Sequence, residues 1–262
     1  MIGVALRFEP SRARAPLASR PPDGVRLRLM TWNIGYAELE ADTRAHTKDL
    51  KSVAETILAS DPDAIALQEL TGEEQLRTLL GYLRGRYRGA AARAAGQDRV
   101  EAVLVKDAGA RFEDVPGGAK YALGATFRPR PGLPQIEFVS AHADAFSAAR
   151  RRDYTEHVVD WVRARPSGDV VFVAGDFNFE LGERDESHLY TDDLRHDAEA
   201  YNLLLKYFRD LGRDAGDTAI NDRRIDYIFG TPEVARLLRA EVLHGAAVGR
   251  MDHAPLLVEI SL

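Results

Sequence analysis

The chain has 262 residues, of which 45% are hydrophobic and 29% are charged, and its formal net charge is −6. This composition is ordinary for a globular protein with a substantial core, and the negative charge argues against dependence on bulk electrostatic attraction to nucleic acid. The absence of cysteine excludes a disulfide scaffold, a zinc–thiolate site and a thiol nucleophile.

No apolar run approaches the roughly 18 residues that a transmembrane helix needs, so none is expected. The first six residues are too short for the apolar region of a signal peptide, and Arg7 follows them directly. We expect a cytoplasmic, monomeric protein.

Residues 1–24 contain four Arg and four Pro with little periodicity, which predicts a poorly ordered basic tail. Residues 25–262 show strand and helix patterns without an internal repeat or linker, so we predict a single α/β domain. The expected strands cover 25–33, 64–67, 100–106, 121–127, 135–140, 169–174, 224–229 and 256–260. The expected helices cover 47–59, 73–83, 147–165, 199–211 and 232–239.

Polar side chains of catalytic type follow several of the predicted strands. They are Asn33, Glu69, His142, Asp176 with Asn178, Asp226, and the pair Asp252-His253. Each has an ordinary explanation as a turn residue, and Gly175-Asp176 is typical of a strand that simply ends in a turn. Polar residues of this type at six strand ends are harder to explain as turns alone. Strands that pack side by side would bring these ends together. We infer that these groups converge in one cleft.

The chemistry of this set indicates a hard divalent cation and a phosphate ester. Glu69 and Asp252 offer carboxylate oxygens, which suit Mg²⁺ or Mn²⁺. The chain has no His-x-x-His pair for zinc, no Gly-x-Ser-x-Gly elbow and no Gly-x-x-x-x-Gly-Lys-Ser/Thr loop. Two His, several carboxylates and such a cation fit the in-line hydrolysis of a phosphate ester.

Six short motifs, taken in order, resemble those of the endonuclease/exonuclease/phosphatase superfamily. They are Thr31-Trp32-Asn33-Ile34, Leu67-Gln68-Glu69, Ser140-Ala141-His142, Gly175-Asp176-Phe177-Asn178, Arg224-Ile225-Asp226-Tyr227-Ile228 and Met251-Asp252-His253-Ala254-Pro255. The resemblance covers about residues 25–262. It implies an α/β fold, a four-layer α/β/β/α sandwich in which two mainly antiparallel sheets are flanked by helices.

The resemblance also implies which residues hold the metal and the water. Glu69 would ligate an essential Mg²⁺, for which Mn²⁺ is the alternative, with Asn33 and Asp252 near or on the metal. Asp176 would orient and activate the attacking water, and Asn178 would hold that water or the phosphate.

Two His would act on the phosphate. The resemblance implies that His253 contacts the scissile phosphate and that Asp226 raises its basicity through a hydrogen bond. His142 corresponds to the second phosphate-binding His of deoxyribonuclease-like members. Asp98 stands where the acidic partner of His142 would fall, and the alternative for Asp98 is a solvated pair with Arg99.

The sequence leaves the substrate open. Two segments are basic, residues 84–99 and Arg150-Arg151-Arg152, and they would either bind a polyanion or form a solvated surface. The segment 180–199 is acidic, and it would repel a nucleic-acid backbone, bind a cation, or be solvated. We predict a Mg²⁺-dependent phosphodiesterase that acts on a nucleic acid, a small molecule or a lipid. The alternatives are a phosphomonoesterase of the inositol-phosphate or nucleotide type and a non-catalytic binding protein of the same fold.

Overall fold

The computed structural model describes residues 24–35, 43–92, 99–115, 120, 122–164, 170–181, 193–231 and 236–262, with only the backbone for residues 43–48. The predicted basic tail, apart from Gly24, and Asp98 therefore lie outside the described residues. No helix in the described ranges is long and apolar enough to cross a membrane.

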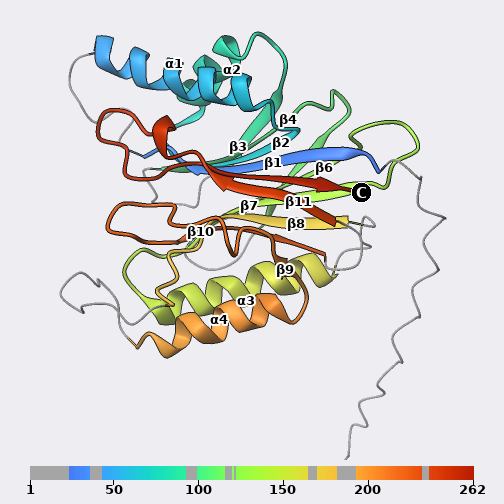
Figure 1. Ribbon diagram of the computed structural model, residues 1–262, viewed down its shortest axis with the longest axis vertical. Helices are drawn as coiled ribbons and strands as arrows, with labels where there is room; N and C mark the ends of the chain where they lie inside the picture. The colour runs from blue at the N-terminus through green and yellow to red at the C-terminus, as the bar shows by residue number, and fades with distance from the viewer. Residues whose placement is uncertain are drawn as a thin grey trace, which may run out of the picture.

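Two six-stranded sheets pack face to face, as Figure 1 shows. The first has the order β11-β12-β1-β2-β4-β3, with β11 Arg236–Val242, β12 Leu256–Ser261, β1 Arg26–Asn33, β2 Ala64–Leu70, β4 Val100–Val105 and β3 Arg88–Ala92. The second has the order β5-β6-β7-β8-β10-β9, with β5 Arg111–Val115, β6 Ala122–Phe127, β7 Ile136–His142, β8 Val170–Asp176, β10 Asp226–Gly230 and β9 Arg209–Asp210. The pairs β1–β2 and β7–β8 are parallel and the other pairs are antiparallel, which confirms the expected fold class.

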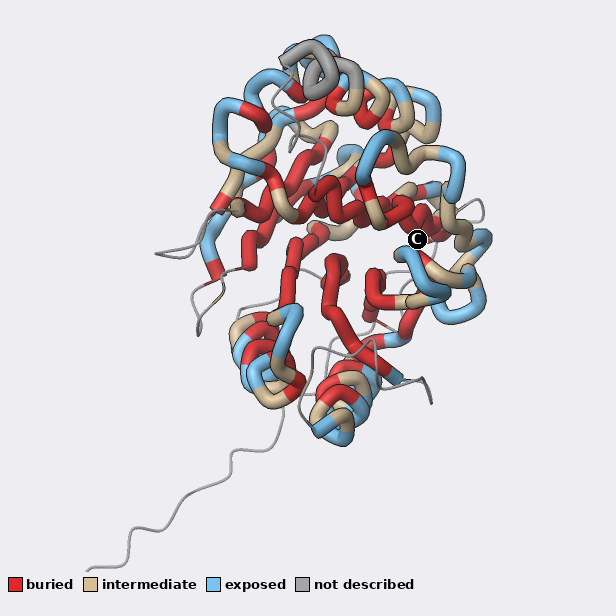
Figure 2. Tube along the Cα trace, turned by 90° about the vertical axis from the view of Figure 1, so that its left-hand side faces the viewer, coloured by how far each residue is buried: buried red, intermediate tan, exposed pale blue. Residues whose placement is uncertain are grey.

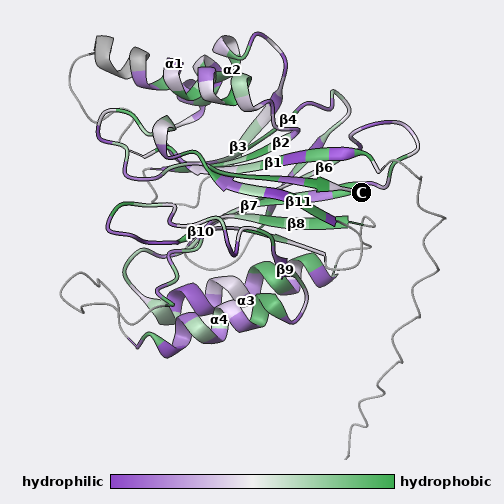
Figure 3. Cartoon of the chain, viewed as in Figure 1, coloured by the Kyte–Doolittle hydropathy of each residue, from purple (hydrophilic) through white to green (hydrophobic). Residues whose placement is uncertain are grey.

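Helices cover the outer face of each sheet. Helices α1 (Thr43–Ser60) and α2 (Glu73–Tyr82) lie on the first sheet, and α3 (Ala148–Ala164) and α4 (Arg195–Leu205) lie on the second (Figure 1). Hydrophobic and hydrophilic residues alternate along these helices in Figure 3, because each helix buries one side and exposes the other. In α3 the buried residues include Tyr154, Val158 and Val162, and the partly buried Trp161 packs against the same cluster.

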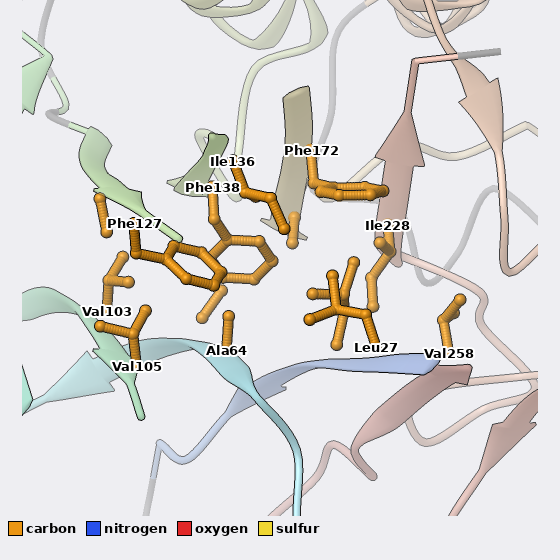
Figure 4. Close-up of a cluster of buried hydrophobic side chains, with 14 of the residues drawn as sticks. Leu27, Ala64, Val103, Val105, Phe127, Ile136, Phe138, Phe172, Ile228 and Val258 are labelled. Carbon is orange, nitrogen blue, oxygen red and sulfur yellow. The ribbon is translucent and has the colours of Figure 1, made fainter. Parts of the chain in front are cut away.

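The main core fills the space between the sheets. Figure 2 shows the strands as the buried layer, and Figure 4 shows Phe138, Phe172 and Leu27 meeting across the interface. Strand β8 is buried on both faces, because Phe172 and Ala174 face the other sheet while Val171 and Val173 face the helices. This explains its continuous apolar sequence, in which each large side chain contributes about 1.5–3 kcal/mol on burial.

The parallel pairs bring polar residues to one end of the sandwich. Asn33 at the end of β1 pairs with Gln68 of β2, and His142 at the end of β7 pairs with Asp176 of β8. Asn33 of the first sheet also donates a hydrogen bond to Asp176 of the second, so all four strand ends meet. This end of the sandwich carries the candidate site.

Two predicted helices need correction. Residues 236–239, expected at the end of a helix, belong to β11, which pairs with β12 and places Leu237 and Ala240 against the main core. The helix expected at 199–211 is α4, which ends at Leu205, and Arg209–Asp210 instead forms β9 against β10. In both cases pairing with a neighbouring strand outweighs a local helical pattern. Strands β3 and β5 carry little apolar alternation and were not expected.

Candidate active site

Asn33 links the carboxylates of the two sheets. Its Nδ2 atom donates to Glu69 Oε1 at 3.1 Å and to Asp176 Oδ2 at 3.0 Å. The Gly35 N–H donates to Asn33 Oδ1 at 2.9 Å, which fixes the orientation of the amide. Asn33 therefore holds Glu69 and Asp176 at a set separation in the centre of the site.

Two imidazoles flank Asp176. His142 Nε2 and His253 Nε2 each lie 3.8 Å from Asp176 Oδ2. The other ring nitrogens are anchored on buried carboxylates: His253 Nδ1 lies 2.8 Å from Asp226 Oδ2, and His142 Nδ1 lies 3.0 Å from Glu101 Oε1. Each ring is thus held with its Nε2 directed towards the centre.

The carboxylates and imidazoles of the site shift the pKa values of one another. Burial disfavours the imidazolium of His253, but the carboxylates of Asp226 and Asp176 outweigh this effect and raise its pKa to about 10. At His142 burial also disfavours the imidazolium, but the carboxylate of Glu101 outweighs this effect and raises the pKa of the ring. Burial alone would raise the pKa of Asp176, yet the two imidazoles and the Asn33 hydrogen bond hold that pKa below its usual range. At neutral pH the site therefore holds an ionised Asp176 carboxylate beside a protonated His253, and the surroundings of His142 favour its protonated form.

Two site residues adopt a left-handed backbone conformation that is unusual for a side chain of their kind. Glu69 has a φ of 61° at an irregularity in the pairing of β2 with β4, and Asn178 has a φ of 52°. The Asn178 N–H donates to Asp176 Oδ1 at 2.9 Å, and its Nδ2 lies 3.4 Å from the Ala143 carbonyl. Strain of this kind is concentrated at functional sites, where surrounding contacts maintain it.

Buried hydrogen bonds connect the two sheets next to the site. Thr31 Oγ1 donates to Gln68 Oε1 at 3.3 Å, and Gln68 Nε2 donates to Ser140 Oγ at 3.1 Å in the opposite sheet. Trp32 Nε1 donates to the His253 carbonyl at 3.1 Å. These contacts fix the relative position of the two sheets at the site.

The donors present fit a hard divalent cation. Burial and the nearby carboxylates of Glu69 and Asp176 raise the pKa of the half-buried Asp252, against the opposing effect of His253. A Cβ at Gly35 would lie 2.4 Å from Glu69 Oε2, so glycine keeps the space beside that oxygen open. Three neighbouring carboxylates with open space beside one of them are the donor chemistry that Mg²⁺ and Mn²⁺ use.

A second grouping of metal-type ligands overlaps the first. One ligand atom each from Asp176, Asp226 and His253 lies within 4.8 Å of the others, and all three residues are buried. This cluster is consistent with a metal site. However, His253 and Asp226 already hydrogen-bond to each other through Nδ1 and Oδ2, so we favour the Glu69 side of the site for the ion.

The sequence matches the Endonuclease/Exonuclease/phosphatase family over residues 30–248. The chain belongs to this family. A search of curated proteins finds no sequence match.

Solved structures of family members share the fold. An endonuclease/exonuclease/phosphatase from Bacteroides vulgatus superposes with a TM-score of 0.70 and 18% identity over 91% of this chain and 99% of that chain. A mannosyl-6-phosphatase from Bacteroides thetaiotaomicron gives a TM-score of 0.65 at 18% identity over 90% and 100% of the two chains. The human Nocturnin catalytic domain with a bound sulfate gives 0.63 at 18% identity over 90% and 94%.

The structure brings together the residues that the family motifs predict. Contacts or mutual electrostatic effects join the following set: Asn33, Glu69, His142, Asp176, Asn178, Asp226, Asp252 and His253. The acidic partner of His142 is Glu101, whereas the candidate Asp98 lies outside the described residues. Glu101 is a charged residue in an otherwise apolar strand, Val100-Glu101-Ala102-Val103, and this irregularity was its only sequence signal.

Sequence reasoning also missed Lys120. Its Nζ atom donates to the Ala143 carbonyl at 2.9 Å, the oxygen that Asn178 Nδ2 also approaches. Its charge acts on His142, where it opposes the effect of Glu101. Within the described residues Lys120 has no ion-pair partner, so it places a partly buried ammonium beside the site.

Proposed function

We propose that this family member is a Mg²⁺-dependent hydrolase of phosphate esters that acts as a phosphodiesterase. The observation that supports this best is the ionised Asp176 carboxylate, held by Asn33 and by the Asn178 N–H between two imidazoles whose Nε2 atoms lie 3.8 Å away. This arrangement offers a proton acceptor for water and two imidazole donors for phosphate oxygens at the same point.

Each residue has a role that follows from its contacts. Asp176 accepts the proton of the attacking water, since its carboxylate remains ionised at neutral pH. His253, as an imidazolium, and His142 donate from Nε2 to the non-bridging oxygens, where negative charge is held in the transition state. Asn178, anchored on Asp176 and close to Ala143, orients the water or the phosphate.

Glu69, Asn33 and Asp252 would hold the metal. When bound, Mg²⁺ supplies charge neutralisation at the phosphate. The three side chains offer carboxylate and amide oxygens, and Gly35 keeps the adjoining space open.

A phosphomonoesterase is the second candidate, and Lys120 favours it. A phosphate monoester carries one more negative charge than a diester, and Lys120 adds a further cationic side chain beside the two imidazoles. The two candidates use the same catalytic groups and differ in the charge of the substrate.

The experiment is a Mg²⁺ titration of hydrolysis over plasmid DNA, bis-p-nitrophenyl phosphate, p-nitrophenyl phosphate, sphingomyelin and inositol phosphates. Asp176→Asn and His253→Ala should each lower turnover by roughly 10²–10⁴-fold. Glu69→Gln should raise the Mg²⁺ concentration needed for half-maximal rate, and Glu73→Gln, on the exposed side of α2, is the control. Wild-type turnover in both the Asp176 and His253 variants would show that the proposal is wrong.

A further inference from the structure

The strongest feature outside the catalytic set is a buried ion pair between α3 and α4. Arg151 Nε and Nη2 donate to the two oxygens of Asp197, each at 2.7 Å. The side chains are 1% and 0% exposed, so this bidentate pair is sealed from water. It joins one residue of the basic cluster 150–152 to one residue of the acidic segment 180–199. The sequence analysis predicted no pairing between these two segments.

Stability alone is a weak reason for such a pair. Removing two charges from water costs several kcal/mol per ion, and apolar side chains of similar volume often stabilise a fold equally well. The remaining contacts of the pair are therefore informative. Arg151 Nη1 donates to the Asp144 carbonyl at 3.1 Å, and the Glu180 N–H donates to Asp197 Oδ2 at 3.1 Å.

Both contacts hold backbone next to catalytic groups. Asp144 lies two residues after His142, and Glu180 lies two residues after Asn178. The two segments are also joined directly, because the Ala143 N–H donates to the Asp176 carbonyl at 2.9 Å. The ion pair thus holds together the loops that follow β7 and β8.

Glu180 continues the connection to the third catalytic loop. Arg223 Nε donates to Glu180 Oε1 at 2.5 Å. The Arg223 carbonyl accepts from the Thr218 and Ala219 N–H groups, and Thr218 Oγ1 accepts from the Asp226 N–H at 3.0 Å. A continuous set of contacts therefore runs from the loop of His142 to the residue that orients His253.

We propose that Arg151 and Asp197 are positioning residues, whose buried ion pair holds the loops of His142 and Asn178 at the spacing that hydrolysis requires. The proposal rests on the proposed phosphate-ester hydrolase function. The effect passes to the catalytic loops through the Asp144 carbonyl and the Glu180 N–H.

The test separates folding stability from positioning. The variants are Arg151→Met, Asp197→Leu, the double variant and Arg151→Lys, with Arg152→Met as the control. Arg152 is the next residue of α3 and pairs with Asp153 and Glu199 at the surface, so it reaches no catalytic loop. The readouts are Tm, kcat and KM for the best ester, and amide hydrogen exchange at residues 143–147 and 177–181.

Each single variant leaves one buried charge unpaired and should lower Tm by about 10 °C. The double variant should regain a Tm close to that of the wild type, yet it cannot donate to Asp144 or accept from Glu180. We expect its kcat to remain roughly 10–100-fold low with KM changed less than about threefold, because the catalytic groups are misplaced while substrate binding persists. Exchange should accelerate in both loops. Arg152→Met should match the wild type throughout, and Arg151→Lys should recover part of kcat.

A double variant with wild-type kcat and unchanged exchange would overturn the proposal, since the ion pair would then be merely structural. Failure of the proposed function looks different: the wild type itself would hydrolyse none of the esters. In that case the exchange rates still decide whether the ion pair holds the loops.

Discussion

Nδ1 of His253 lies 2.8 Å from Oδ2 of Asp226, and both side chains are buried. A free imidazole in water has a pKa of about 6.5, whereas the surroundings of His253 raise its pKa to about 10. The folded protein therefore binds a proton at neutral and mildly alkaline pH that the unfolded chain releases. This difference links the free energy of unfolding to pH.

The first prediction concerns this linkage in metal-free protein. Because the pKa of His253 is raised on folding, its stabilising contribution is complete below pH 6.5 and is lost as the pH rises through about 10. Urea unfolding in EDTA at pH 7, 8 and 9 should show the unfolding free energy falling by up to roughly 1.4 kcal/mol per pH unit. Asp226→Asn should flatten this slope, and His244→Asn, outside the site, should keep it. An equal slope in the Asp226 variant would contradict the assignment.

The second prediction concerns Glu101, whose Oε1 lies 3.0 Å from His142 Nδ1. Glu101→Gln keeps the shape but removes the charge that raises the pKa of His142, so the ring should lose its proton at lower pH. We expect kcat/KM near pH 8 to fall about 10–100-fold and the alkaline limb of the profile to move to lower pH. Profiles from pH 5 to 9 measure this, with the exposed Glu55→Gln on α1 as the control. A profile of unchanged shape would remove Glu101 from this role.

The third prediction concerns Lys120. If its ammonium binds substrate, Lys120→Met should lower kcat/KM more for the dianion p-nitrophenyl phosphate than for the monoanion bis-p-nitrophenyl phosphate. The additional loss should be roughly tenfold or more, because one further unit of charge faces the missing cation. Lys120→Arg should retain most of the rate, and the exposed Lys51→Met on α1 should have no effect. Equal losses for both esters would mean that Lys120 only ties the loop at Ala143.

The fourth prediction concerns Gly175, which precedes Asp176 in β8. Its φ is 153°, and a Cβ there would lie 1.8 Å from the Ala141 carbonyl oxygen. Gly175→Ala should lower the unfolding free energy by roughly 3 kcal/mol or more, since backbone must move in both strands. Gly81→Ala is the control: a Cβ in that helix meets nothing within 4 Å, and the substitution should stabilise by about 0.5–1 kcal/mol. Thermal unfolding followed by circular dichroism compares the two.

The sequence by itself identified the residues of the candidate site. Apolar β-branched runs that stop at a polar residue predict strands whose ends carry function, and Asn33, Glu69, His142 and Asp176 were found in this way. Their convergence follows from local rules, because parallel neighbours such as β7 and β8 end at the same edge. The family motifs supplied the order and the expected two-sheet sandwich, which the structure confirms.

Only the tertiary structure decided which charges pair. Glu101 is 41 residues from His142, and Arg151 is 46 residues from Asp197. No local pattern selects such partners, because a charged residue could pair with many residues of opposite charge elsewhere in the sequence. The packing of the helices and strands decides which of them lies within reach. The same reason explains β11, whose residues 236–239 have a helical pattern in isolation but form a strand beside β12. The residues of the candidate site can therefore be predicted from the sequence, whereas the contacts that hold them in place depend on packing.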